Sequence, residues 1–267
     1  MSDYQLKLVE MLRWLTKFIE EKGLRYYVVE GTMLGTIRHK GMIPWDDDVD
    51  IAMPREDYEK LLQLLKEPVE HYVVESYESE AKDYIYAFAK FYDMNTSMTE
   101  KLRRNVKRGV YIDIFPLDGL GNTKEEAFKH YKKIDKRNML LATNVCALRK
   151  GRKFLKNCAV LVGRCLPINT KKLIKKINDT CKKYTYDDSE FVVNSMSTYR
   201  FREIMDKSIY GEPTKYEFED FYVYGPEKAD EYLTILYKNW RQFPPEDKRH
   251  AEHDFIELDL NKPYKTK

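Results

Sequence analysis

The sequence predicts an α+β fold, with a mixed sheet and flanking helices in its first half and a mainly helical, basic second half. Short segments rich in strand-forming residues recur before residue 124, whereas apolar residues at helical spacing prevail after it. Hydrophobic residues make up 43% of the 267 residues, which is enough to build a core. We therefore expect two parts, a core over residues 1–124 and a helical region over residues 125–267 that completes its site.

Charge is distributed unevenly along the chain. The formal net charge is +3, but residues 129–183 contain 17 Lys and Arg against only Asp135 and Asp179. This segment therefore carries +15, which leaves −12 for the rest of the chain. An acidic part and a basic part indicate either two tasks or one task at an anionic surface.

The elements follow in chain order from the spacing of apolar residues. Helical spacing predicts a helix over residues 3–21, and Pro54 is expected to begin another. A turn and a short helix are expected over residues 31–40. Strand-forming or alternating segments predict strands at 26–29, 47–52, 73–74, 84–92 and 110–115. After residue 124 we expect helices, with few strand signals before residues 255–256.

The segment WDDDVDI, residues 45–51, is the most informative part of the sequence. On a strand, side chains two apart share a face, so Asp46, Asp48 and Asp50 project together. Like charges about 6.5 Å apart repel each other unless a cation or hydrogen bonds offset the repulsion. Hard divalent cations prefer oxygen ligands, and Mg²⁺ fits best where phosphate supplies the remaining ligands. The alternative is a solvated acidic turn.

A second acidic position lies between bulky apolar residues in the segment YIDIF, residues 111–115. Asp113 is costly in such a strand unless it has a partner. If this strand lies beside the first, Asp113 completes a three-carboxylate metal site with Asp48 and Asp50. Asp118, close to a proline and a glycine, is expected in a turn.

Upstream, the segment EGTMLG, residues 30–35, follows a predicted strand and opens a predicted helix. Glycine lets the backbone approach a phosphate, and the start of a helix offers free N–H groups. The Gly31-Thr32 turn lies about 16 residues before the Asp-x-Asp strand, which makes it more informative than an isolated turn.

The order of these motifs resembles the polymerase-β-like nucleotidyltransferase pattern of a Gly-Ser/Thr turn, a strand with paired acids, and a third acid on a later strand. More narrowly, GTMLGTIRHKGMIPWDDDVD at residues 31–50 looks like the signature of the LicD family. That family includes bacterial phosphocholine transferases and is similar to the fukutin-related sugar-modifying enzymes. The clear likeness covers about residues 24–66, with support at 109–119 and in FPPEDKRH at 243–250.

The resemblance implies a nucleotidyltransferase fold and a magnesium-dependent transferase, with Mn²⁺ as an alternative cofactor. Asp48, Asp50 and Asp113 are then the catalytic and metal-binding residues, and Asp113 either shares the metal or acts as a general base. The implied substrate-binding residues are Gly31, Thr32, Gly35, Arg38 and Trp45.

Two further residues, Arg38 and His39, lie between these motifs. Arg38 either clamps a phosphate oxygen or forms a structural ion pair with Asp46 or Asp47. His39 is expected to be an exposed loop residue.

The implied reaction moves phosphocholine from CDP-choline to a glycan or lipid-linked glycan, as in the synthesis of teichoic acid or lipopolysaccharide, and releases CMP. Alternatives are another CDP-linked alcohol such as CDP-ribitol, nucleotidyl transfer, and a catalytically inactive binding module. The three intact aspartates argue against the inactive module. Choline requires an aromatic cage, for which the candidates are Trp45, Tyr84, Tyr86 and Tyr111.

The segment KKLIKKI, residues 171–177, alternates basic pairs with aliphatic residues. This pattern favours either contact with the inner leaflet of an anionic membrane or a solvated basic helix face. Nucleic acid is not an expected partner.

The first residues lack a secretory apolar core, no uncharged run reaches membrane length, and no cysteine pair has CxxC spacing. We therefore expect a cytoplasmic protein, peripheral at the membrane if the basic segment binds lipid. His250 and His253 are too few for a structural zinc site and are expected at a helix end or at the edge of the active site.

Overall fold

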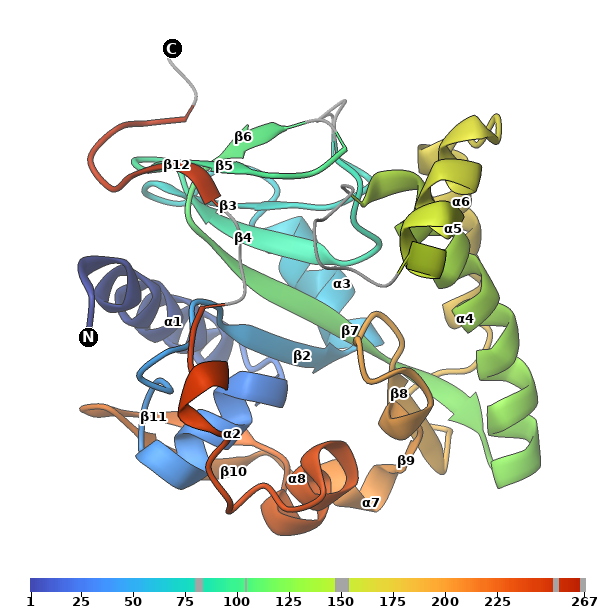
Figure 1. Ribbon diagram of the computed structural model, residues 1–267. Coiled ribbons are helices and arrows are strands. Elements are labelled where there is room, and N and C mark those ends of the chain that lie inside the picture. The colour runs from blue at the N-terminus through green and yellow to red at the C-terminus, as the bar shows by residue number, and fades with distance from the viewer. Residues whose placement is uncertain (80–83, 104, 147–153, 252–254, 265–267) are drawn as a thin grey trace.

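The computed structural model describes residues 1–79, 84–103, 105–146, 154–251 and 255–264 (Figure 1). Its helices are α1 (Asp3–Glu21), α2 (Glu30–His39), α3 (Arg55–Leu64), α4 (Lys124–Val145), α5 (Phe154–Cys165), α6 (Thr170–Cys181), α7 (Lys207–Tyr210) and α8 (Ala229–Tyr237), with short 3-10 turns η1 (Arg200–Glu203) and η2 (Glu246–Lys248). Its strands are β1 (Tyr27–Val28), β2 (Asp50–Pro54), β3 (Tyr72–Glu75), β4 (Ala89–Asp93), β5 (Ser97–Glu100), β6 (Val106–Arg108), β7 (Tyr111–Gly121), β8 (Phe191–Asn194), β9 (Met205–Asp206), β10 (Thr214–Phe218), β11 (Phe221–Gly225) and β12 (Phe255–Asp259). The predicted α+β class is confirmed.

The long strand β7 organises the main sheet. The strand order is β1-β2-β7-β4-β3, with β8 added to β7 and β9 added to β8. β2 and β7 are parallel, and the other neighbours are antiparallel. The first part of β7 pairs with β4, whereas its last residues pair with β8, so the sheet curls along this strand. Two smaller sheets, β10-β11 and β12-β5-β6, complete the strands.

The predicted first helix is confirmed as α1, which shows why its sequence is helical. Ser2 accepts a hydrogen bond from the Gln5 backbone N–H at 3.2 Å, and the Gln5 side chain accepts one from the Ser2 backbone N–H at 2.9 Å. This capping box satisfies N–H groups that a helix start leaves free. Leu8, Leu12 and Leu15, spaced three or four apart, are fully buried against the sheet.

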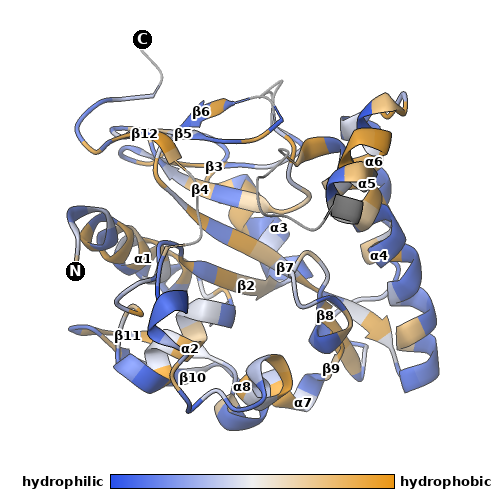
Figure 2. Ribbon diagram, in the orientation of Figure 1, coloured by the Kyte–Doolittle hydropathy of each residue, from blue (hydrophilic) through white to orange (hydrophobic). Residues whose placement is uncertain are grey.

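Two hydrophobic clusters form most of the core. The larger one packs α1, α2, α3 and α8 around the main sheet, and the second lies between β7, α4 and α6. Figure 2 shows α4 as mostly hydrophilic along its length, consistent with a helix that buries only one face. The second cluster attaches the basic helices to the end of β7.

Several predicted elements were wrong in extent. β8 to β11 lie in the half where few strands were expected, and β8 finds its partner in β7, about 70 residues earlier. The strand expected at 47–52 begins only at Asp50, and the one expected at 84–92 is reduced to β4. Asp118, expected in a turn, lies inside β7 and is buried. The extent of these strands depends on pairing partners far away in the sequence, which the local spacing of residues does not reveal.

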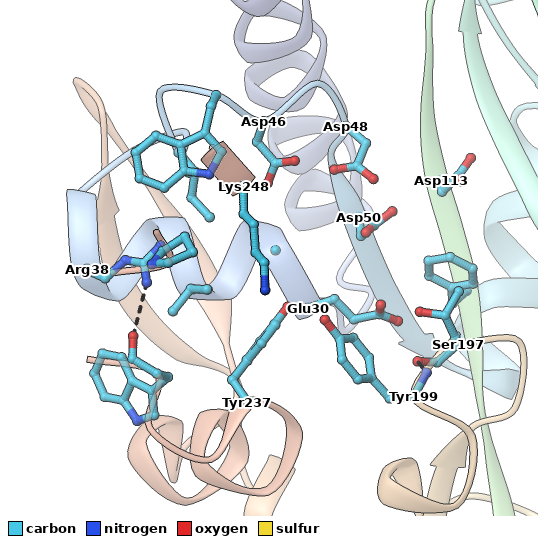
Figure 3. Close-up of a pocket in the computed structure, with 18 of the residues that line it drawn as sticks. Glu30, Arg38, Asp46, Asp48, Asp50, Asp113, Ser197, Tyr199, Tyr237 and Lys248 are labelled. Atoms are coloured by element: carbon cyan, nitrogen blue, oxygen red, sulfur yellow. Dashed lines mark hydrogen bonds between the residues drawn. The ribbon is translucent and has the colours of Figure 1, made fainter. Parts of the chain in front are cut away.

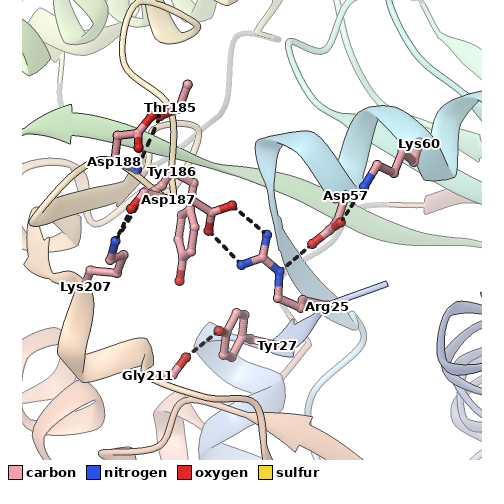
Figure 4. A network of polar contacts seen from close by, with 10 residues as sticks. All are labelled: Arg25, Tyr27, Asp57, Lys60, Thr185, Tyr186, Asp187, Asp188, Lys207 and Gly211. Carbon is pink, nitrogen blue, oxygen red and sulfur yellow. Dashed lines mark hydrogen bonds and ion pairs between the residues drawn. The ribbon is translucent and has the colours of Figure 1, made fainter. Parts of the chain in front are cut away.

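Arg25, just before β1, connects α3 to the loop that precedes β8 (Figure 4). Its Nε donates to Asp57 at 2.6 Å, and its Nη1 donates to Asp187 at 2.8 Å. In the same region Lys207 donates to the Asp187 carbonyl oxygen at 2.6 Å. Residues more than 160 positions apart are thereby held beside the same end of the sheet.

None of the helices in the described part of the chain has both the length and the hydropathy needed to cross a bilayer. In α6, Ile174 and Ile177 are fully buried in the second cluster, while Lys171, Lys172 and Lys175 are exposed. This arrangement matches the solvated basic face, because the aliphatic residues of α6 are already covered. Membrane contact of residues 171–177 stays a prediction.

Candidate active site

A cavity of about 630 Å³ lies beside the start of β2. Its walls come from α2, the loop before β2, β7, the loop after β8, and the segment that follows α8 (Figure 3). The residues along it are Glu30, Gly31, Leu34, Arg38, Ile43, Trp45, Asp46, Asp48, Asp50, Phe88, Asp113, Phe115, Met196, Ser197, Thr198, Tyr199, Tyr237, Asn239, Trp240, Gln242, Pro244, Lys248 and His250.

The three aspartates predicted to act together line this cavity. Asp50 and Asp113 are direct partners in the register of the parallel strands β2 and β7. The Asp113 backbone N–H donates to the Val49 carbonyl oxygen at 3.1 Å, which fixes this register. Asp48 lies two residues before Asp50, in the loop rather than on the strand. Three carboxylates from two chain segments thus face one space (Figure 3).

Asp46 joins this group. One oxygen each of Asp46, Asp47 and Asp48 lies within 4.8 Å of the others. Burial, followed by the charge of Asp48, raises the pKa of Asp46 to about 8. Burial and then Asp48 also raise the pKa of Asp50 well above its ordinary value. These carboxylates are desolvated and repel one another, which is the condition that a bound cation relieves.

The residues present therefore fit a divalent metal ion. The donor set consists of carboxylate oxygens, which hard cations prefer, and the cavity leaves room for phosphate oxygens beside them. Asp48, Asp50 and Asp113 remain the predicted ligands, and Asp46 is close enough to Asp48 to contribute an oxygen.

Asp113 has a cationic partner that the sequence did not suggest. Lys90 is its cross-strand neighbour on β4, and the Lys90 ammonium donates to Asp113 Oδ1 at 2.7 Å. Burial raises the pKa of Asp113 to about 6, and Lys90 opposes that rise. Asp113 therefore lies between an acid, Asp50 on β2, and a base on β4.

Two of the three tyrosines expected to surround choline, Tyr86 and Tyr111, instead pack against this lysine. The Lys90 ammonium lies 3.3 Å from the ring centroid of Tyr111 and 4.4 Å from that of Tyr86. Tyr84 donates its hydroxyl to the Phe88 carbonyl oxygen at 2.7 Å. None of these three tyrosines lines the cavity, whereas Trp45, Tyr199 and others do.

The predicted glycine and threonine positions have distinct local roles. Gly31 lines the cavity, and a Cβ there would lie 2.9 Å from Asp46 Oδ2. Thr32 does not line it; its hydroxyl accepts a hydrogen bond from the Asp50 backbone N–H at 2.8 Å. Gly35 does not line it either, and a Cβ there would lie 2.5 Å from the Gly41 carbonyl oxygen. Thr32 and Gly35 thus position the start of β2 and the loop before it, and their predicted contact with substrate is not seen in the cavity wall.

Arg38 and Trp45 both line the cavity. Arg38 donates to the Trp240 carbonyl oxygen at 3.0 Å and lies over Phe243, 4.8 Å from the ring centroid. Among the described residues it forms no ion pair with Asp46 or Asp47, the alternative considered for it. His39 ends α2 and packs edge-on against Trp45, with ring centroids 5.7 Å apart, so it is partly buried rather than an exposed loop residue.

Sequence reasoning missed two further charged residues of the cavity. Glu30 opens α2 with φ +48°, and burial raises the pKa of its carboxyl to about 7. Lys248 comes from η2 and reaches into the cavity (Figure 3). Its side chain forms no hydrogen bond or ion pair with the described residues. The FPPEDKRH segment was the signal that could have identified Lys248, and His250 of the same segment lies at the cavity edge as expected. His253 lies outside the described residues.

Fold and site together define an α+β protein with a carboxylate-rich cavity suited to a divalent cation and a phosphate group. Residues 23–142 match the nucleotidyltransferase domain of the LicD/FKTN/FKRP family, so the resemblance to the LicD family predicted from the sequence is confirmed.

Named relatives agree with this placement. Over 258 residues the chain is 27% identical to the lipopolysaccharide cholinephosphotransferase LicD of Haemophilus influenzae, covering 95% of this chain and 96% of that protein. It is 40% identical over 57 residues to the human ribitol 5-phosphate transferase FKRP, covering 21% of this chain and 12% of that protein. It is also 27% identical over 133 residues to mannosyltransferase regulator 4 of Saccharomyces cerevisiae, covering 46% of this chain and 10% of that protein.

Proposed function

We propose that this chain is a magnesium-dependent phosphotransferase that moves phosphocholine from CDP-choline to a sugar hydroxyl of a cell-surface glycan precursor, of teichoic acid or lipopolysaccharide. The observation that carries this proposal is the convergence of Asp48, Asp50 and Asp113 on one cavity. The likeness to a cholinephosphotransferase over nearly the whole chain supports the choice of donor.

Phosphoryl transfer requires positioning and charge neutralisation more than covalent chemistry. Bound Mg²⁺ would neutralise the donor diphosphate, with Asp48 and Asp50 holding it. On the other wall Arg38 and Lys248 offer cationic groups to the remaining phosphate oxygens. The acceptor oxygen bonds to phosphorus as the bond to the CMP oxygen breaks.

Asp113 has two roles open to it. Its Oδ1 accepts from Lys90, so its second oxygen remains to bind the metal or to take the proton of the acceptor hydroxyl. A quaternary ammonium group binds aromatic faces, and those at the cavity are Phe88, Phe115, Trp45, Tyr199, Tyr237 and Trp240.

A second candidate uses the same site for another CDP-linked alcohol, such as CDP-ribitol. The likeness to ribitol 5-phosphate transferase favours it, but that likeness extends over only 57 residues. Nucleotidyl transfer is the third reaction that these carboxylates could perform.

Donor labelling separates these reactions. Purified protein, Mg²⁺ and CDP-choline that carries one label in choline and another in cytidine are incubated with a glycan acceptor. We expect choline label on the glycan and cytidine label in free CMP. Cytidine on the acceptor would instead support nucleotidyl transfer, and no transfer from CDP-choline with transfer from CDP-ribitol would support the second candidate.

The site is tested separately by amide variants. Asp48→Asn and Asp50→Asn should lower turnover by about 10³-fold or more, since each removes a charge worth several kcal/mol at the reacting phosphate. The matched control is Asp220→Asn, the same change at an exposed residue between β10 and β11. Wild-type activity in either site variant would reject the assignment.

A further inference from the structure

A second cavity, of about 710 Å³, lies between the β6 side of the structure and the basic helices. It is lined by residues from the segment before β4, from the region around β6, from the end of α4, and from the α5–α6 connection. Three cationic side chains, Arg103, Arg164 and Lys171, lie along its wall. None of the described residues along this wall is Asp or Glu.

The two arginines are held in place by backbone carbonyl oxygens. Arg103 donates to the Asn144 carbonyl oxygen at 3.3 Å, and Arg164 donates to the Cys146 carbonyl oxygen at 3.2 Å. The Arg164 Nε atom is buried and has no hydrogen-bond partner among the described residues. Neither arginine nor Lys171 forms an ion pair within the described part of the chain. Concave sites lined by one sign of charge concentrate ions of the opposite sign.

The remaining groups along the wall indicate which kind of ligand the cavity fits. Asn105, Asn169 and Thr170 supply polar groups, and α6 begins at Thr170, so its N-terminal end faces the same region. Ile85, Val106, Leu166 and Ile168 supply apolar surface. Guanidinium forks match the geometry of phosphate oxygens, and the apolar surface is suited to a hydrocarbon chain.

We propose that this second cavity binds the phosphate or diphosphate group of an amphiphilic ligand, with Arg103, Arg164 and Lys171 as the anion-binding residues. Residues that are close together in the sequence line the two cavities: Tyr84 and Ile85 line the second, and Phe88 lines the first. Use of this site to anchor a phosphate-bearing acceptor rests on the proposed function. Anion binding itself does not.

The test is calorimetric binding of inorganic pyrophosphate and of geranyl diphosphate to the full chain in EDTA. Without a divalent ion the first cavity disfavours both probes, because its five carboxylates outnumber the cationic side chains of Arg38 and Lys248. Lys171→Gln removes one lining charge at an exposed position that tolerates substitution. Lys172→Gln is the matched control, since it makes the same charge change on the next residue, which does not line the cavity.

We expect pyrophosphate affinity to fall at least fivefold in Lys171→Gln and further in Arg103→Gln, while Lys172→Gln binds as the wild type does. Equal affinity in Lys171→Gln and Lys172→Gln would overturn the proposal, even if Arg103→Gln fails to fold. Tighter binding of geranyl diphosphate, reduced by Leu166→Ser, identifies a lipid phosphate as the ligand. Equal affinity for both probes would overturn the assignment of an amphiphilic ligand and leave a free phosphate compound as the occupant of the anion site.

Discussion

Asp113 is the residue whose neighbours explain most of the site. It lies between Asp50 on β2 and Lys90 on β4, so one strand supplies a like charge and the other an opposite charge. Lys90 is almost fully buried and packs over two tyrosine rings whose hydroxyls both donate to Glu100. This network fixes the lysine, and the lysine in turn orients one oxygen of Asp113.

Replacing Lys90 should therefore change the pH dependence of turnover. Lys90→Met keeps most of the side-chain volume but removes the charge that lowers the Asp113 pKa. That pKa should rise, so the acidic limb of the pH–rate profile should move to higher pH by about 1 unit or more. The measurement is kcat/KM between pH 5 and 9.

The control for this variant is Lys107→Met on β6, which removes an equal charge from an exposed position. Lys90→Arg should recover part of the wild-type profile. An unshifted profile with merely lower turnover would show that Lys90 acts only in packing.

At the scale of single residues, the sequence predicted the aspartates that line the cavity but not the lysine, Lys90, that pairs with Asp113. Three aspartates in two short motifs suggested a shared site, and the parallel register brings two of them together. Lys90 in AKFYD resembles any lysine in a half-exposed strand, and only the pairing of β4 with β7 places it opposite Asp113. Thr32 and Gly35 belong to the recognised motif, but which of its residues face the cavity depends on how α2 packs against residues 41–50.

Among the elements, α3, α6 and β7 are joined through the buried side chain of Arg55. Arg55 donates to Asp118 at 2.7 and 2.9 Å, and its third contact is the Asn178 side-chain oxygen at 3.1 Å. Ser195 also donates to Asp118, at 3.3 Å. The start of α3 is thereby tied to the part of β7 that carries β8.

Breaking the ion pair of Arg55 with Asp118 should destabilise the whole fold. Arg55→Met leaves Asp118 buried without its counter-ion, which should lower the free energy of unfolding by about 3–5 kcal/mol. Arg25→Met is the comparison, because Arg25 is partly exposed and its ion pairs should contribute about 1 kcal/mol or less. Urea unfolding followed by circular dichroism measures both, and equal losses would contradict the distinction.

Element prediction succeeded where the signal is local and failed where it is not. α1 carries its own cap and its own apolar stripe, so its bounds could be predicted closely. β8 and β9 consist of four and two residues, and their strand character comes from pairing with β7 and with each other. Asp118 looked like a turn residue beside Pro116 and Gly119, since nothing nearby in the sequence shows that Arg55 will pair with it.

The whole molecule separates its charges, as the sequence indicated. Acidic groups converge on the first cavity, and cationic groups that form no ion pair with any described residue line the second. The predicted division at residue 124 stays a prediction. Two sets of contacts cross this division: the pairing of β7 with β8, and the hydrophobic cluster between β7, α4 and α6.

Concentration of carboxylates in one cavity should make the stability of the metal-free protein fall as pH rises. Glu30 and Asp46 have folded-state pKa values of about 7 and about 8, above those of the unfolded chain, because burial disfavours their charged forms. At pH values between the unfolded-state pKa and the folded-state pKa of each group, the folded state binds more protons than the unfolded state. Raising the pH removes those protons and forces charge into the cavity, so the free energy of unfolding decreases.

The decisive window is pH 7.0 to 8.5. His39 and His130, whose pKa values burial lowers, act in the opposite direction only up to about pH 6.5, where a free histidine titrates. In EDTA the free energy of unfolding should fall by on the order of 1 kcal/mol across this window. With millimolar Mg²⁺ the loss should disappear, since the cation binds the ionised carboxylates of the folded state alone.

Urea unfolding of the wild type and of the double variant Asp48→Asn/Asp50→Asn tests whether these carboxylates cause the loss. The double variant should lose less stability in EDTA and gain nothing from Mg²⁺. A wild-type stability that is flat in EDTA and indifferent to Mg²⁺ would mean that these carboxylates neither repel one another nor hold a cation.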